Sequence, residues 1–99
     1  MAAQLDDQTN LAILARLQGQ MAAREGDTAA AEQHFGRSVE ILETIDPYQA
    51  AVAKLTWGEQ MLALQQLQKG EKLVREAHRV FADLGAQREE KNATNLLAA

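Results

Sequence analysis

Apolar residues recur three or four positions apart along most of this chain, which is the spacing of amphipathic helices. The first such stretch predicts a helix over about 7–24, with a stripe of apolar side chains at Leu11, Leu14, Ala15, Leu17, Met21 and Ala22. Gly26 follows, where a helix end favours a residue with positive φ, and Asp27 can cap the next helix. That second helix is predicted over about 28–45, with Ala31, Phe35, Ser38, Val39, Leu42 and Ile45 on its buried side.

The dipeptide Asp46-Pro47 is the clearest boundary in the chain. Proline at the first helical position lacks only an amide that would have no partner there, and aspartate is a favoured cap. A third helix is therefore predicted over about 47–64. A fourth follows over about 69–84, with Gly85 as its stop. A last helix over about 86–97 offers few apolar contacts and is interpreted as a capping helix over an open end.

The joint between the third and fourth helices has no local boundary signal of its own. The turn residues Gly26-Asp27 correspond, 39 residues later, to Gln65-Gln66, where neither glycine nor proline stands. A left-handed residue other than glycine costs on the order of 1 kcal/mol, which tertiary packing can override, and we expect a turn there. The alternative is one continuous helix over 47–84, roughly 57 Å long at 1.5 Å per residue, which would force a swapped or extended dimer.

The chain also nearly repeats itself once. Gly19 recurs as Gly58 and Glu32 as Glu71, at the same shift of 39 residues. A period between 20 and 50 residues indicates stacked supersecondary units, each too thin to bury its own apolar face. The sequence thus predicts a single all-α domain over 1–99, built from antiparallel helical hairpins. The first repeat covers about 7–45, the second about 47–84, and the capping helix about 86–97.

Composition narrows the possible functions. The formal net charge is −4, whereas domains that grip phosphate backbones usually gather Lys and Arg, so no nucleic-acid partner is expected. The chain has no Cys, and no run of about 18 apolar residues suggests a membrane span. A cytoplasmic protein without a membrane partner is the expectation.

Candidate catalytic chemistry is sparse. His34 and His78 are the only imidazoles, and neither has a second ligand at metal-binding spacing. No nucleophile motif, zinc motif or phosphate-binding glycine loop occurs. Neither an enzyme nor a bound cofactor or metal is therefore expected.

The small residues of the first unit resemble the tetratricopeptide repeat family, in which two helices form each unit. Gly19 matches the small position of helix A, Gly26-Asp27 the turn, and Ala31 the small position of helix B, with Phe35 one turn later. The longer period and the closing run 81–89 are similar to arrays in bacterial multidomain signalling proteins. This resemblance implies a non-catalytic protein interaction module whose A helices line a concave surface.

The same resemblance implies which residues meet a peptide or partner protein. Taking Gly19 and Gly58 as equivalent, the concave positions are Ile13, Arg16, Gln20 and Arg24 in the first unit and Val52, Leu55 and Glu59 in the second. Some family members hold a terminal carboxylate with a Lys and an Asn, and Arg16 and Gln20 occupy the matching positions here. Glu59 would repel a carboxylate, so this ligand is not favoured.

A second interpretation is self-association without a groove ligand. Two units leave apolar area exposed at the ends of the array, where at least three units are usually needed for stability. In this interpretation a second copy would cover Trp57, Tyr48, Leu55 and the pair Leu96-Leu97.

Overall fold

The computed structural model describes the backbone of residues 2–98 and the side chains of residues 7–98. This part of the chain forms five helices joined by short turns, which confirms the all-α prediction. The helices are α1 (Ala2–Arg24), α2 (Thr28–Glu43), α3 (Pro47–Ala63), α4 (Leu67–Leu84) and α5 (Gln87–Ala98).

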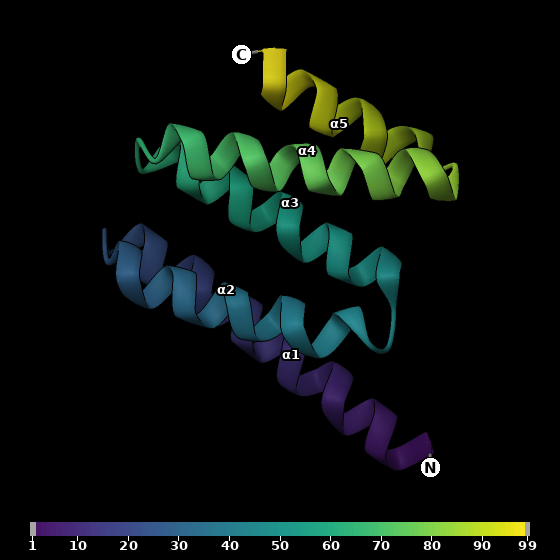
Figure 1. Cartoon of the computed structure of the whole chain (residues 1–99). Helices are drawn as coiled ribbons and strands as arrows, with labels where there is room; N and C mark the ends of the chain where they lie inside the picture. Colours follow the sequence, from purple (N-terminus) through teal and green to yellow (C-terminus); the bar gives the residue numbers. More distant parts are fainter. Residues whose placement is uncertain (1, 99) are drawn as a thin grey trace.

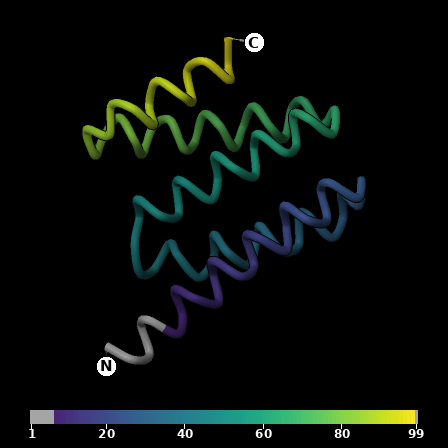
Figure 2. Tube along the Cα trace, turned by 180° about the vertical axis from the view of Figure 1, so that it is seen from behind, coloured from purple at the N-terminus to yellow at the C-terminus, as the bar shows by residue number. Residues whose placement is uncertain are grey.

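Consecutive helices run antiparallel and lie in two layers. Helices α2 and α4 form the front layer in Figure 1, whereas α1, α3 and α5 form the back layer, which faces the viewer in Figure 2. The molecule is a thin slab of 42 × 34 × 16 Å. Since the hairpins are stacked side by side, α1 and α5 lie at opposite edges of the slab (Figure 1).

Most helix boundaries follow the predicted ones, because the capping residues act as expected. The Oδ1 atom of Asp27 accepts a hydrogen bond from the backbone N–H of Ala30 at 3.1 Å, and Asp46 accepts one from Gln49 at 3.2 Å. Gly85 ends α4 in the left-handed conformation, with φ 72°. The main difference is at the start of α1, which begins at Ala2 and not near residue 7.

The predicted turn between the third and fourth helices is present. Gln65 adopts φ 67°, the left-handed region, and the backbone N–H of Gln66 then bonds to the carbonyl of Met61 at 2.8 Å. This is the closing bond of a helix C-terminus. The alternative of one continuous helix over 47–84 is therefore wrong for this structure.

Helix α1 has two apolar faces, and the residues predicted to form one stripe are divided between them. Its inner face is made of small residues, namely Ala12, Ala15, Gly19, Ala22 and Ala23, all buried. Its longer side chains point outward, with Leu14, Leu17 and Met21 exposed. The small face is needed because the ring of Phe35 in α2 lies directly over Gly19.

In each hairpin, a close contact holds the two helices together. A Cβ added to Gly58 in α3 would lie 2.7 Å from Val74 Cγ2 and 3.0 Å from the carbonyl oxygen of Gly70 in α4. In the first hairpin, the buried Ser38 hydroxyl donates a hydrogen bond to the carbonyl of Ala12 at 2.7 Å. Close backbone approach thus fixes the relative position of α3 and α4, and a buried polar contact ties α1 to α2.

The Gly58 contact predicts opposite effects for two glycine substitutions. Gly58→Ala should lower the free energy of unfolding by about 1–3 kcal/mol, because the methyl group would overpack the helix crossing. Gly36→Ala is the control, since its Cβ would meet only Trp57 at 3.7 Å, an ordinary contact. Removing an interior helical glycine there should raise stability by about 0.5–1 kcal/mol. Urea unfolding followed by circular dichroism measures both changes, and equal effects would contradict the packing described.

The strained turn gives a second prediction. Gln65→Gly should raise the free energy of unfolding by about 1 kcal/mol, because glycine adopts positive φ without a steric cost. Gln65→Ala retains the Cβ and should give no such gain. The same urea titration compares the two variants, and a gain with alanine would show that φ at this position is not the cause.

Candidate functional site

A hollow of about 450 Å³ lies between α3 and α5 at one edge of the slab. Both helices belong to the back layer, which Figure 2 shows from its own side. The residues that line the hollow are Leu55, Thr56 and Glu59 from α3, and Asn92, Asn95 and Leu96 from α5. We call this hollow the α3–α5 groove.

The lining of the α3–α5 groove is suited to binding and not to bond chemistry. Asn92 and Asn95 stand three residues apart on one face of α5, and each amide offers both donors and acceptors. Leu55 and Leu96 are half-buried and supply apolar surface on the two walls. Glu59 is the only charged residue in the lining. The lining has no imidazole, thiol or second carboxylate that could activate a nucleophile or relay a proton.

Helix α5 is held as the outer wall of the groove by packing and by a hydrogen bond at its start. Its Ala93 is fully buried. The Tyr48 hydroxyl at the start of α3 donates to Glu89 Oε1 at 2.8 Å, and the Tyr48 ring meets Phe81 edge to face at 6.0 Å. His78 of α4 lies 3.8 Å from Glu90. These contacts fix α5 against both α3 and α4.

The Tyr48–Glu89 hydrogen bond changes the acidity of both groups. The bond to Glu89 raises the pKa of Tyr48 above its ordinary value, chiefly because it favours the protonated phenol. The same bond lowers the pKa of Glu89, because the hydroxyl stabilises the carboxylate. The pair is therefore strongest where the phenol is protonated and the carboxyl is ionised.

The structure brings together only part of the predicted binding surface. Leu55 and Glu59 line the α3–α5 groove. Val52 packs mainly into the apolar cluster around Phe81, so it contributes to the core. The four predicted residues of α1 do not line this groove: Ile13, Arg16, Gln20 and Arg24. Their role as partner contacts stays a prediction.

The residues that α5 contributes to the groove were not predicted from the sequence, because that helix was interpreted only as a cap. The signal was present in the repeat: a second shift of 39 residues carries Thr56 onto Asn95 and places α5 in the position of another helix A. Helix α5 thus continues the back layer, and its Asn92, Asn95 and Leu96 face α3 across the hollow. Tyr48 and Trp57, expected to be available to a second copy, pack mainly within the chain.

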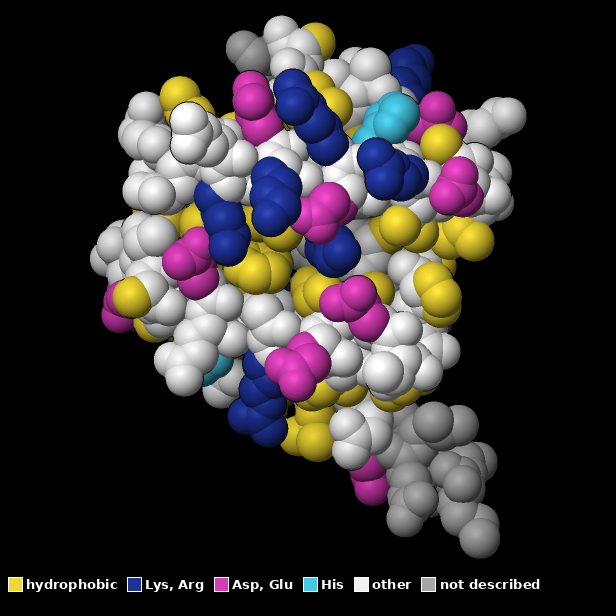
Figure 3. All heavy atoms as spheres, in the orientation of Figure 1, with side chains coloured by type: hydrophobic (Ala, Val, Ile, Leu, Met, Phe, Trp, Pro, Cys, Tyr) yellow, Lys and Arg dark blue, Asp and Glu magenta, His cyan; other side chains and the backbone are white. Residues whose placement is uncertain are grey.

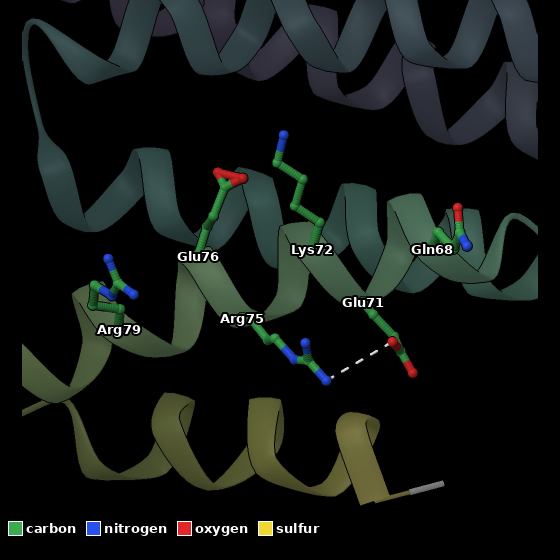
Figure 4. Close-up of a pocket in the computed structure, with 6 residues that line it drawn as sticks. All are labelled: Gln68, Glu71, Lys72, Arg75, Glu76 and Arg79. Carbon is green, nitrogen blue, oxygen red and sulfur yellow. Dashed lines mark ion pairs between the residues drawn. The ribbon is translucent and has the colours of Figure 1, made fainter.

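A second hollow, of about 370 Å³, follows the outer side of α4 and is lined by that helix alone. In Figure 4, Lys72 and Glu76 point toward α2 while Arg75 and Glu71, an ion pair at 3.9 Å, point toward α5. Figure 3 shows cations and acids interspersed over this face. Because its side chains diverge and its charges alternate, it has the character of a solvated helix face.

A third hollow, of about 300 Å³, separates α2 from α4. Trp57 lies there, with its ring stacked on Phe35 at 6.2 Å between centroids and the Lys69 ammonium 5.0 Å from its ring. Its Nε1 is enclosed and has no hydrogen-bond partner among the described residues. Acids and lysines alternate along this hollow too, including the pair Lys54–Glu76 at 3.5 Å.

Comparison with protein-family models, with curated proteins and with solved structures finds no match to this chain. Within the helices that the structure describes, none is long and apolar enough to cross a membrane. Among side chains 7–98, no three of the metal-binding types His, Cys, Asp and Glu are grouped as a metal site would require.

The Tyr48–Glu89 hydrogen bond predicts a pH-dependent effect of Tyr48→Phe. The pKa of Glu89 is lower in the folded chain, so the stabilisation is present above the ordinary carboxylate range and is lost as pH falls through the folded value. The pKa of Tyr48 is raised, so the stabilisation is also lost as pH rises beyond the ordinary value of 10.0.

The measurement is the free energy of unfolding of both proteins across this range. The difference between wild type and Tyr48→Phe should be largest between these limits and should shrink at both ends. The variant keeps the aromatic ring against Phe81, which isolates the hydroxyl. A difference that does not change with pH would mean that the pair does not stabilise α5.

Proposed function

We propose that this chain is a non-catalytic protein interaction module that binds a peptide segment in the α3–α5 groove. The observation that carries the proposal is the lining of that groove, in which two asparagines of α5 and Glu59 of α3 stand beside one leucine from each helix. The tetratricopeptide-like repeat pattern supports it, because helix-A surfaces of such arrays present concave binding faces.

The chemistry of the lining favours a peptide over other ligands. Each asparagine amide can pair with a peptide N–H and C=O, which every peptide presents whatever its sequence. Leu55 and Leu96 offer apolar surface to one side chain of the ligand. Glu59 then favours a neighbouring Lys or Arg and disfavours acidic residues or a chain carboxylate. The module should therefore prefer a segment with an apolar residue beside a cationic one.

The proposed surface extends along the back layer toward α1. Arg16 and Gln20 occupy the same helix-A positions as Leu55 and Glu59, and both are half-buried, so they are partly fixed in place. A longer partner protein would reach Ile13 and Arg24 on the same helix. A second candidate function is self-association, which the exposed apolar face of α1 favours.

A display selection with random peptides tests the proposed function. The whole chain should enrich peptides with an apolar residue next to Lys or Arg, and Asn92→Ala with Asn95→Ala should weaken these peptides about tenfold or more, the loss of two hydrogen bonds near 1 kcal/mol each. Glu59→Lys should reverse the charge preference toward acidic peptides.

The control is Glu71→Lys, an exposed acid on α4 in the other layer, which should leave the selected peptides unchanged. Peptides that bind equally well to all of these variants would place the binding surface elsewhere. A selection without enrichment would contradict the proposal itself.

A further inference from the structure

The outer face of α1 is the most exposed apolar surface among the described side chains. Leu14 is 52% exposed, Leu17 49% and Met21 59%, with Leu11 and Ile13 beside them at 42% and 39%. At 100° per residue Leu14, Leu17 and Met21 fall within one narrow sector of the helix, opposite the small residues that contact α2. We call these five residues the α1 stripe. Contiguous apolar surface of this kind marks an interaction site.

The repeat indicates what normally covers this face of a helix A. On α3 the positions equivalent to Leu11 and Leu14 are Ala50 and Ala53, and both are buried in a cluster with Val39 and Leu42 of α2. Inside the array, large side chains of the preceding helix therefore pack onto alanines. The α1 stripe has leucines at these positions, so it does not offer the small surface that an α2-like helix covers. Leucines in a helical stripe instead interdigitate with another leucine stripe.

The charges at the two ends of the stripe are complementary to those of a second α1 that runs antiparallel. Asp7 and Arg24 are both exposed and lie on either side of the stripe, one near each end. Neither forms an ion pair within the described side chains. If Leu14 of one copy lies level with Leu17 of the other, Asp7 of each copy lies level with Arg24 of the other. A parallel arrangement would instead place like charges together.

We propose that two copies of this chain associate through their α1 stripes as an antiparallel, two-fold symmetric dimer. Such an interface is self-complementary, because every contact occurs twice. The apolar residues form its centre, and the Asp7–Arg24 pairs fix the orientation at both ends. Helix α1 lies at the opposite edge of the slab from α5 (Figure 1), so the dimer leaves the α3–α5 groove free, whereas it covers Ile13 and Arg24.

The dimer is tested first by its mass in solution. Sedimentation of the whole chain from micromolar to near-millimolar concentration should show a dimer that dissociates on dilution. Leu14→Glu with Leu17→Glu should give a monomer with unchanged helicity. Leu67→Glu is the control, since Leu67 is equally exposed, at 57%, but lies on α4. A monomeric wild type at every concentration would overturn the proposal, as would larger open-ended assemblies.

Two charge reversals then test the arrangement. Asp7→Arg and Arg24→Asp should each weaken the homodimer about tenfold, because each places like charges at both ends of the interface. Mixing the two variants should restore association, since each cation then meets an acid, and the double variant should dimerise like the wild type. Single reversals without effect would exclude the antiparallel arrangement. A dimer that survives the Leu14/Leu17 change would place the interface elsewhere. A different protein that binds the stripe while the chain itself stays monomeric would also overturn the proposal.

Discussion

A helical array of two layers cannot bury every apolar face of its own helices, and this constraint shapes the whole molecule. The slab is only 16 Å thick in one direction, so each helix of the back layer depends on its neighbours on both sides for cover. Helix α3 lies between the first hairpin and α5, and its Ala50, Ala53 and Met61 are buried. Helix α1 has a neighbour on one side only, and its outer leucines remain exposed.

Small residues decide how closely the layers can approach within that constraint. Gly19 leaves room for the Phe35 ring, and Gly58 with Gly70 lets two helix backbones nearly touch. An interior helical glycine costs roughly 1 kcal/mol relative to alanine, so these positions give up local stability for close packing. The gain is that Phe35, Val74 and Phe81 are completely enclosed in a chain of 99 residues. Such a small core depends on each of these contacts.

The local signals of the sequence were sufficient to predict the helices and most of their boundaries, but not the start of α1. The carboxylates of Asp27 and Asp46 cap α2 and α3 by accepting hydrogen bonds from backbone N–H groups, and Gly85 ends α4. The turn at Gln65 was inferred from the repeat and not from any residue preference, since tertiary packing holds that residue at positive φ. What one helix cannot reveal is which of two apolar faces turns inward. In α1 the alanines turn inward and the leucines outward, because Phe35 requires the smaller surface.

The candidate site could not be predicted from the pattern of a single helix, because it is formed between two helices, α3 and α5, that are separated in the sequence by α4. Leu55 and Glu59 were identified from their equivalence to positions in the first unit. Asn92 and Asn95 were not, because few apolar residues in the last helix suggested a cap with no further role. In the back layer, Asn92 and Asn95 of α5 form part of one wall of the groove. The helix is polar because this wall is not part of the core. The buried Ala93 and the hydrogen bond between Tyr48 and Glu89 hold α5 in the array, so most of its other side chains can remain polar.

The two edges of the slab therefore differ in chemistry as well as in position. One edge carries a groove lined by both amides and apolar side chains, which suits reversible binding of a peptide. The other carries exposed leucines, an isoleucine and a methionine with opposite charges at the ends, which suits the proposed association with a second copy. Because α1 and α5 are separated by the full stack of helices (Figure 1), a dimer through α1 would place the two grooves at its far ends. Two linked grooves raise the apparent affinity for a bivalent partner without any new contact, provided that the partner spans the distance. The exposed face of α1 and the polar groove beside α5 would then serve one function, because dimerisation would raise the apparent affinity of two weakly binding grooves.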